Sequence, residues 1–326
     1  MTARRRLALV GVGSMGANHA RVIAESDRTD LAVIVDPDHA RVAPLAQRVG
    51  CEYSRDIEAA ARCDAAVIAT PTQLHAEQAL QLLSQGRPLL VEKPLAATLS
   101  ESAAIIDAAR RLALPLMCGF VERFNPAVTT VLSLLEEDPL HVVGLRHSPM
   151  TPRSTLSVVF DLLIHEIDLA LRYISGHGVA SVCAVTSDAG RGAVTEVSDC
   201  VLGFDSGALA TLSASRAGQR KVRTHLVSTA TALYEIDLLR QDVTVYRHLA
   251  HEQVEGSAMY RAETAVDVPF VRHRGEPLAL QLEHFLDLLD GDGDIDVERN
   301  GILPAHEVAA RVEEASTAPV LVGAAS

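Results

Sequence analysis

Short apolar runs alternate with segments of helical periodicity along the first part of the chain. The apolar runs are expected to form buried strands at about residues 7–10, 31–35, 65–69, 89–91 and 115–119. Helices are expected between them, at about residues 17–25, 39–48, 73–85 and 100–111. Strands that alternate with helices of this length predict an α/β fold, with a doubly wound parallel sheet between two layers of helices.

The pattern changes after about residue 120. Helices are expected at about 125–135 and 160–174, with a strand between them at 141–148. Residues 178–270 then alternate short apolar stretches with turn signals such as Asp205-Ser206-Gly207. This segment predicts an open, mostly antiparallel sheet with a few helices on one face. Two more helices are expected near the end, at about 278–289 and 304–316.

Two domains follow from this change, since 326 residues also exceed the usual length of one domain. We predict a first domain over residues 1–121 and a second over residues 122–326. Whether the last helices stay with the second domain or pack back on the first is left open.

Composition narrows the class of protein. Hydrophobic residues make up 48% and charged residues 22% of the chain, as in a globular protein with a sizeable core. The net charge of −13 argues against nucleic acid or an anionic membrane as a general partner. No apolar run approaches the length of a membrane span, and the five scattered cysteines indicate a reducing, cytoplasmic setting.

A glycine-rich turn follows the first apolar run. Gly11, Gly13 and Gly16 have the spacing G-x-G-x-x-G between the expected strand and the next helix. In a dinucleotide-binding turn, the first glycine permits the tight turn and the second lets the backbone approach a pyrophosphate. The third lets helix and strand pack closely. Alone, the motif also fits a tight turn that binds nothing.

Asp36 ends the second expected strand, 20 residues beyond Gly16. A dinucleotide fold places a carboxylate near this distance to bind the hydroxyls of the adenosine ribose. The same carboxylate repels a 2′-phosphate, so we predict NAD in preference to NADP. The alternative is a turn or helix cap, because Asp36-Pro37-Asp38 is also good turn chemistry, and both roles can hold.

No metal site is expected. The alternating acids of residues 290–296 match the start of a calcium-binding loop, but Ile295 and Gly301 stand where that loop needs glycine and glutamate. The segment fits a solvated turn better. His165-Glu166 also lacks the second histidine of a zinc-peptidase helix.

Lys93 follows another expected strand, in the sequence Glu92-Lys93-Pro94. Ligands of parallel sheets bind beyond the carboxyl ends of the strands. A lysine at this edge can donate a hydrogen bond to a substrate hydroxyl and favour the loss of its proton. The Lys93-Pro94 bond is a candidate for a cis peptide. The alternative is an ordinary lysine of a surface loop.

A second cluster lies on the helix expected at residues 160–174. Asp161, His165 and Asp168 are spaced i, i+4 and i+7, so a continuous α-helix would place them on one face. A carboxylate could fix the tautomer of the imidazole, and the free ring nitrogen could act as a base. The alternative is an ordinary core or surface histidine.

Together these motifs resemble the glucose–fructose oxidoreductase / inositol dehydrogenase / MocA family. The resemblance covers nearly the whole chain and rests on the three glycines, Ala69-Thr70-Pro71 with His75, Glu92-Lys93-Pro94, and Asp161-x-x-x-His165-x-x-Asp168. It implies a Rossmann domain followed by an α/β domain whose open sheet often forms oligomer contacts. It also implies a catalytic trio of Lys93, Asp161 and His165.

The chain departs from the family pattern in one place. Many members carry a glycine pair shortly before the aspartate, where this chain has Val158-Val159. Residues 122–128 and 161–168 look more like the branch of UDP-N-acetylglucosamine 3-dehydrogenases and related sugar-modifying enzymes. The predicted cofactor contacts are Gly11, Gly13, Ser14, Met15, Gly16, Asp36, Thr70, Pro71, His75, Glu92 and Lys93. The predicted substrate contacts are Lys93, Arg123, Phe124, Asp161 and His165.

These features predict an NAD-dependent oxidoreductase that moves hydride between a secondary alcohol of a sugar and the nicotinamide. The expected substrate is a nucleotide-linked or amino sugar that reacts at C3. One alternative is an aminoglycoside, aminocyclitol or inositol ring in secondary metabolism, and another is an NAD-binding sensor without catalysis. We also expect a homo-oligomer, a dimer or tetramer, formed through the C-terminal sheet.

A diphosphate on the substrate would need cations to bind it. The second domain offers six candidates, and solvated surface charge is the alternative for all of them: Arg123, Arg153, Arg216, Arg220, Lys221 and Arg223.

Overall fold

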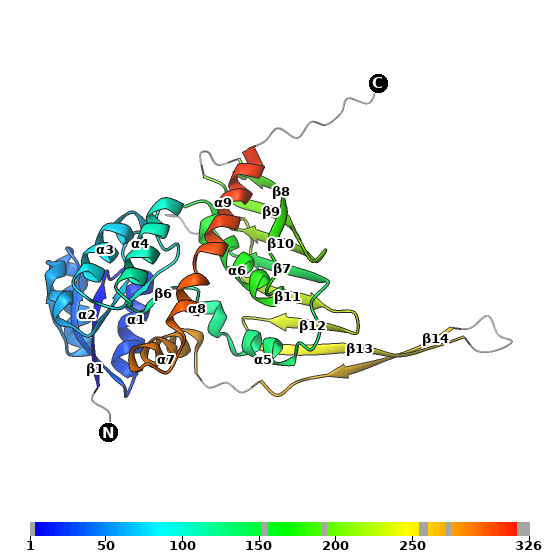
Figure 1. Ribbon diagram of the computed structural model, residues 1–326, viewed down its shortest axis with the longest axis horizontal. Helices are drawn as coiled ribbons and strands as arrows, with labels where there is room; N and C mark the ends of the chain where they lie inside the picture. Colours follow the sequence, from blue (N-terminus) through cyan, green and yellow to red (C-terminus); the bar gives the residue numbers. More distant parts are fainter. Residues whose placement is uncertain (1–3, 151–155, 191–193, 254–259, 272–274, 318–326) are drawn as a thin grey trace. The chain divides into compact units, whose positions relative to one another are not determined.

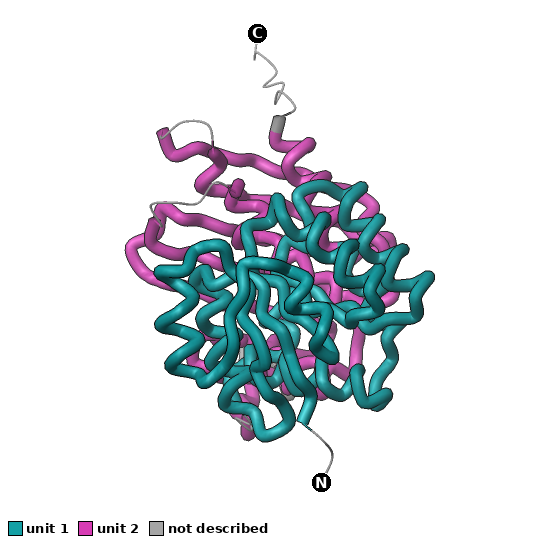
Figure 2. Tube along the Cα trace, turned by 90° about the vertical axis from the view of Figure 1, so that its left-hand side faces the viewer, with its two compact units in different colours: residues 1–124, 274–304 teal, residues 125–273, 305–326 magenta. Residues whose placement is uncertain are grey.

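The computed structural model describes residues 4–150, 156–190, 194–253, 260–271 and 275–317. The chain forms two compact units, one of residues 1–124 with 274–304 and the other of residues 125–273 with 305–326 (Figure 2). The first unit therefore includes a segment from near the end of the chain, whose place the sequence left open.

A six-stranded parallel sheet forms the centre of the first unit (Figure 1). Its order is β3-β2-β1-β4-β5-β6, so the sheet grows outward from the neighbours β1 and β4. The strands are β1 (Arg5–Val10), β2 (Thr29–Val35), β3 (Glu52–Ser54), β4 (Ala65–Ile68), β5 (Leu89–Val91) and β6 (Leu116–Cys118). The predicted doubly wound parallel sheet is confirmed. Strand β3 was not predicted, because none of its three residues is buried and it shows no apolar run.

Helices pack on this sheet through alternate strand residues. Leu7 and Leu9 join one core with side chains of α1 (Ser14–Glu25), α2 (His39–Val49) and α7 (Pro277–Asp290). Helix α3 (His75–Ser84) packs beside α4 (Leu99–Arg111), and α4 contacts α8 (Ile295–Asn300). Three short 3-10 helices follow strands β3, β4 and β6, namely η1 (Ile57–Arg62), η2 (Thr72–Leu74) and η3 (Val121–Phe124).

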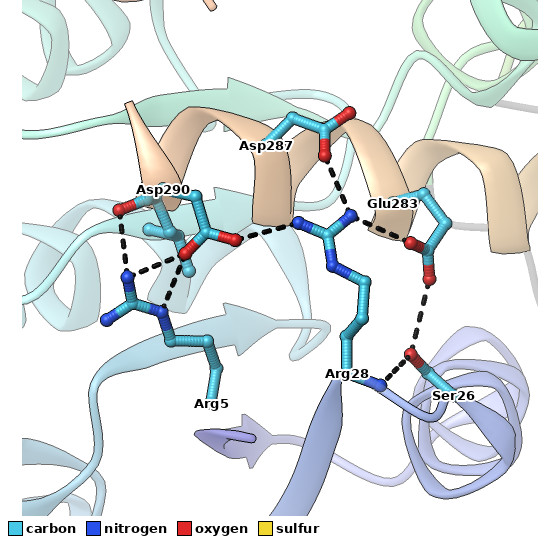
Figure 3. Close-up of polar contacts among 7 residues, drawn as sticks. Arg5, Ser26, Arg28, Glu283, Asp287 and Asp290 are labelled. Atoms are coloured by element: carbon cyan, nitrogen blue, oxygen red, sulfur yellow. Dashed lines mark hydrogen bonds and ion pairs between the residues drawn. The ribbon is translucent and has the colours of Figure 1, made fainter. Parts of the chain in front are cut away.

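Ion pairs fasten α7 to the beginning of the parallel sheet (Figure 3). Arg28 contacts Glu283 at 2.9 Å, Asp287 at 2.7 Å and Asp290 at 2.8 Å. Arg5 contacts the same Asp290 carboxylate at 2.6 Å. Asp290 begins the acidic stretch that was expected to be a solvated turn, and it is instead part of this network.

The other end of the acidic stretch begins a helix. The carboxylate of Asp294 accepts hydrogen bonds from the backbone N–H groups of Asp296 and Val297, at 2.9 and 3.0 Å. It thereby caps α8, which the sequence pattern did not predict because the helix has only six residues. Acids that alternate along this stretch thus have separate structural roles.

An eight-stranded sheet in the order β14-β13-β12-β11-β7-β10-β9-β8 forms the centre of the second unit. Neighbouring strands are antiparallel except β7 and β10, which run parallel. The strands are β7 (His141–His147), β8 (Val179–Ser187), β9 (Val197–Phe204), β10 (Leu209–Ser215), β11 (Val222–Ser228), β12 (Ala232–Asp237), β13 (Asp242–Gln253) and β14 (Tyr260–Asp267). The predicted open, mostly antiparallel sheet is confirmed.

One face of this second sheet is buried and the other is more exposed. Helix α6 (Ile164–Tyr173) packs on β7 and β10, and α5 (Pro126–Leu134) packs on β12 and β13. Ala210 and Leu212 of β10 point to the buried face, whereas Leu209 is 47% exposed. The last helix, α9 (Leu303–Thr317), lies mostly within this unit.

None of the helices in the described residues combines the length and apolar character that crossing a membrane requires. No group of three histidine, cysteine or acidic side chains among these residues could hold a metal ion.

Candidate active site

The glycine-rich turn joins β1 to α1 at the centre of the parallel sheet. Gly11 has a φ of +95°, which favours glycine, and a Cβ there would lie 2.7 Å from the carbonyl oxygen of Ala69. A Cβ on Gly16 would collide with the carbonyl oxygen of Gly11. A Cβ on Gly13 would meet no described atom within 4 Å. Gly11 and Gly16 are therefore needed by the fold itself, whereas Gly13 leaves an open approach to the backbone.

The turn also presents the beginning of a helix. Gly13 is the N-cap of α1, and the next two residues, Ser14 and Met15, are exposed. The first N–H groups of a helix have no partner within the helix and attract anions. A phosphate that approaches Gly13 would meet these donors.

A cavity of about 800 Å³ opens beside the turn, wholly within the first unit. It is lined by residues that follow β1, β2 and β4, including Gly13, Asp36, Thr70 and Pro71. Strands β1 and β4 are neighbours at the point where the sheet order reverses. Doubly wound sheets bind their ligands at such a reversal, and this cavity has room for the adenosine half of a dinucleotide.

Asp36 directly follows the carboxyl end of β2 and has a structural role of its own. Its Oδ2 accepts a hydrogen bond from the N–H of Val12 at 2.9 Å, and its Oδ1 accepts one from the N–H of Asp38 at 2.8 Å. The turn chemistry considered from the sequence is therefore present. Each carboxylate oxygen can accept more than one hydrogen bond, so these contacts leave capacity for a ribose hydroxyl.

His75 connects two loops at the carboxyl edge of the sheet. Its Nε2 lies 2.8 Å from the carbonyl oxygen of Thr70, and its Nδ1 lies 3.0 Å from that of Pro94. The ring is buried and both nitrogens face backbone. His75 thus holds the loop after β4 against the loop after β5, and its contact with a cofactor stays a prediction.

Glu92 and Lys93 follow β5 directly. The Lys93-Pro94 peptide is cis, as predicted. Glu92 is buried, with its Oε1 2.8 Å from Nε2 of His19 on α1, and its Oε2 accepts a hydrogen bond from the N–H of Lys93 at 3.2 Å. Lys93 itself is half-buried. The Glu92 carboxylate therefore faces α1 and the backbone of Lys93.

The predicted base lies in the second unit, on a helix that differs from the expected one. Residues 160–174 were expected to form a continuous α-helix, but a π-helical turn, η4 (Val159–Leu163), precedes α6. A π-turn contains an extra residue, so the i, i+4 and i+7 argument does not hold across Asp161. His165 is 7% exposed and lies on α6 together with Asp168.

Both acids that were expected to flank His165 contact arginines. Oδ2 of Asp161 lies 3.1 Å from Nη1 of Arg216, and Oδ2 of Asp168 lies 4.0 Å from Nε of Arg172. The sequence suggested both acids as partners of the imidazole, and Asp161 also as a substrate contact. Their arginine contacts show that each is also part of a charge pair.

Sequence reasoning missed Glu166, the residue after His165. It is fully buried and contacts Arg146 of β7 and His225 of β11. Burial alone would raise the pKa of this carboxyl, but the charges of Arg146 and His225 outweigh it and hold the pKa at about 2. The available signal was a glutamate on the apolar side of a predicted helix, which needs a partner.

The cations considered for a substrate diphosphate differ widely in burial. Arg123 is buried in the first unit, donates to the carbonyl oxygen of Gly301 at 2.6 Å and lies 4.6 Å above the Phe120 ring. Phe124 lies beside His284, with 5.3 Å between ring centroids. Arg216 is also buried, so surface charge is wrong for both arginines. Arg220 and Lys221 are exposed, Arg223 is half-buried, and Arg153 lies outside the described residues.

Comparisons with known proteins bear on both units. A model described as "Oxidoreductase family, NAD-binding Rossmann fold" matches residues 5–120, and the "GFO/IDH/MocA C-terminal domain" matches residues 146–234. A UDP-N-acetylglucosamine 3-dehydrogenase of Acidithiobacillus ferrooxidans is 30% identical over 289 residues, 87% of this chain and 88% of that protein.

Solved structures agree with these matches. The structure of UDP-N-acetylglucosamine 3-dehydrogenase from Acidithiobacillus ferrooxidans has a TM-score of 0.84 at 25% identity, covering 96% of this chain and 98% of that one. GenD2 from gentamicin A biosynthesis, in complex with NAD, has a TM-score of 0.82 at 22% identity, covering 97% and 95%.

Proposed function

The chain belongs to the glucose–fructose oxidoreductase / inositol dehydrogenase / MocA family, and we propose that it oxidises C3 of a nucleotide-linked or amino sugar with NAD. That it is an NAD-dependent dehydrogenase of sugars or cyclitols follows from the family and its relatives. The finer substrate rests on one observation. The UDP-N-acetylglucosamine 3-dehydrogenase is similar to both units, including the one that would bind substrate.

The first unit fits the adenosine and pyrophosphate parts of NAD. The open backbone at Gly13, the exposed beginning of α1 and the cavity beside Asp36 would hold these groups. When bound, the nicotinamide supplies the hydride acceptor. We assign Asp36 to the ribose hydroxyls, and Asp36→Ser should weaken NAD binding and reduce the preference over NADP. An unchanged ratio of the two binding constants would refute this assignment.

Three residues carry the chemistry in this proposal. His165 takes the proton of the substrate hydroxyl as general base, and Lys93 donates a hydrogen bond to the same oxygen. Asp161 orients the histidine or a substrate hydroxyl. The support for His165 is its place on α6 with little exposure. The support for Lys93 is its place directly after β5, at the carboxyl edge of the same parallel sheet.

Single substitutions of Lys93 and His165 test these roles. In Lys93→Ala and His165→Ala, turnover should fall by about 10²–10⁴-fold, since each removes one acid–base group, while NAD binding stays near normal. Arg240→Ala, which changes an exposed cation of the second unit that has no proposed role in binding, is the control. Reduced nicotinamide formed from a panel of UDP-sugars, aminoglycosides and inositols is the measurement. Unchanged turnover in either variant would remove that residue from the mechanism.

The similarity to GenD2 supports a second candidate substrate, an aminoglycoside or aminocyclitol ring. A cationic substrate of that kind would suit a chain with a net charge of −13. Turnover of aminoglycosides but not of UDP-sugars in the same panel would favour it. NAD binding without turnover of any panel member would instead favour a sensor.

The state of the protein in the cell is also part of the proposal. We propose a cytoplasmic homo-oligomer in which the more exposed face of the eight-stranded sheet meets a second copy. Leu209, Val201 and Val185 support this, since they are apolar, 40–63% exposed and on neighbouring strands of that sheet. A monomer in sedimentation equilibrium would contradict it.

A further inference from the structure

Arg216 has the largest of the fully buried side chains, with 1% of its side chain exposed. It follows the last residue of β10 in the second unit. A guanidinium keeps its charge in a protein and is rarely buried without partners. Its surroundings must therefore compensate both its charge and its donors.

The partners of Arg216 lie in two segments of the chain, residues 156–161 and residues 195–196. Its Nε donates to Oε2 of Glu196 at 3.0 Å, and its Nη1 donates to Oδ2 of Asp161 at 3.1 Å. Its Nη2 donates to the carbonyl oxygens of Leu156 and Thr195, at 2.9 and 3.0 Å. The planar guanidinium holds these groups in a fixed arrangement, because its donors lie in one rigid fork.

The two side chains of the Arg216–Asp161 contact differ in their exposure to solvent. Arg216 is buried, whereas the side chain of Asp161 is 30% exposed. The carboxylate is thus held from its buried side and accessible from the other. An ionised carboxylate only accepts hydrogen bonds, so its accessible side can receive a substrate hydroxyl or an ammonium group.

Asp161 needs such support because of where it lies. It sits in the π-helical turn η4, which contacts β10, and not in the regular α-helix that carries His165. A side chain in a π-turn lacks the register that an α-helix would give it relative to the next turn. A second, rigid contact can supply the missing orientation.

We propose that Arg216 is the positioning residue of Asp161, which it fixes for the reaction by holding Oδ2 from the buried side. The proposal rests on the proposed function, since it gives Asp161 a part in the chemistry. It also reassigns Arg216, which the sequence offered as a substrate cation. Its side chain donates to the carboxylates of Glu196 and Asp161 and to two backbone carbonyl oxygens, so these donors serve the protein itself.

A double-mutant cycle between Asp161→Asn and Arg216→Gln tests the proposal. Arg216→Gln should lower kcat by about tenfold in the native background and by less than about twofold when Asp161 is already asparagine. KM should change less than kcat. Arg216→Lys keeps a positive charge but lacks the planar set of guanidinium donors. It is the second variant to use if Arg216→Gln folds poorly. Guanidinium ion at a non-denaturing concentration should restore part of kcat in Arg216→Ala.

Glu196→Gln is the matched control, because it weakens the other carboxylate contact of the same guanidinium. It should lower stability in urea while leaving kcat within about twofold of native. If Arg216→Gln lowers urea stability but leaves kcat unchanged, the contact is structural and the proposal is wrong. Equal effects of Arg216→Gln on kcat in both backgrounds would also overturn it.

The same cycle measured by urea unfolding separates this proposal from the proposed function. Coupling between the two substitutions in unfolding free energy, with no turnover of any substrate, would leave the contact real and the proposed function wrong. Without turnover, Asp161 has nothing to position, so the positioning role falls as well. No coupling in unfolding would overturn the contact on its own, whatever the activity.

Discussion

Two buried glutamates stand beside the predicted catalytic residues, one in each unit, and they are held in different ways. Glu92 precedes Lys93 and contacts His19 and a backbone N–H, all near the carboxyl edge of the parallel sheet. Glu166 follows His165 and contacts both Arg146 and His225, on two strands of the other sheet. The first acid has one side-chain partner, and the second has a cation as well as an imidazole.

The difference shows how each unit fixes a side chain next to its predicted chemistry. The loop after β5 is held by hydrogen bonds to its own backbone, through Glu92 and through His75. Helix α6 is held by charge pairs that cross to the sheet below it. Loss of a buried charge pair costs more than loss of one hydrogen bond, so the two units should respond unequally to equivalent substitutions.

The largest effect is expected from Glu166→Gln. This variant removes the negative charge that faces buried Arg146, and breaking such a pair costs about 3–5 kcal/mol of unfolding free energy. Urea unfolding of the apo protein measures it. Glu235→Gln, on an exposed carboxylate of β12 that accepts from Tyr246 at 3.2 Å, is the control and should cost less than about 1 kcal/mol. Equal losses in the two variants would contradict the role given to the buried pair.

The pH dependence of that loss sharpens the comparison. The pKa of Glu166 is lowered from 4.5 to about 2 in the folded protein, so its contribution to stability is complete above about pH 5. As the pH falls from 4.5 toward 2, the native protein loses this contribution and Glu166→Gln does not. The difference in unfolding free energy between them should therefore shrink over this window. A difference that stays constant between pH 5 and pH 2.5 would show that the charge of Glu166 does not matter.

Much of the first unit follows from the sequence because its determinants are local. The strand-to-loop order places Gly11, Asp36, Thr70 and Lys93 after neighbouring parallel strands, and topology then brings them to one edge. The same local signals predicted the antiparallel hairpin around Asp205. Strand β3 was not predicted because an exposed edge strand needs no apolar run.

The supports of the second unit could not be predicted in this way. Arg146 and His225 are 20 and 59 residues from Glu166, and Arg216 is 55 residues from Asp161. Such pairs depend on the register of strands that are distant in sequence, which single-residue patterns do not contain. The π-turn before α6 likewise contacts β10, a strand distant in sequence, and helical periodicity alone did not predict it.

A smaller effect is expected from His19→Ala in the first unit. It leaves the buried carboxylate of Glu92 without its imidazole partner, which should cost about 1–3 kcal/mol of unfolding free energy. His39→Ala is the control, because His39 also makes one side-chain contact, to Tyr53 at 2.7 Å, but is exposed. Urea unfolding compares the two variants. If His19→Ala costs as much as Glu166→Gln, the two glutamates are held equally and the comparison fails.

The smallest effect is expected from Arg28→Ala, which separates burial from charge pairing as the cause of these differences. Arg28 contacts three acids of α7, whereas Glu166 contacts Arg146 and His225. The side chain of Arg28 is nevertheless 36% exposed. Exposed pairs contribute about 0–1 kcal/mol each, and salt screens them strongly at about 1 M. In urea unfolding, Arg28→Ala should lower the unfolding free energy by about 1 kcal/mol at low salt, and this loss should largely disappear at high salt. Arg41→Ala, which removes a single exposed pair with Asp38, is the control. A loss as large as that of Glu166→Gln, and insensitive to salt, would mean that the number of partners matters more than their burial.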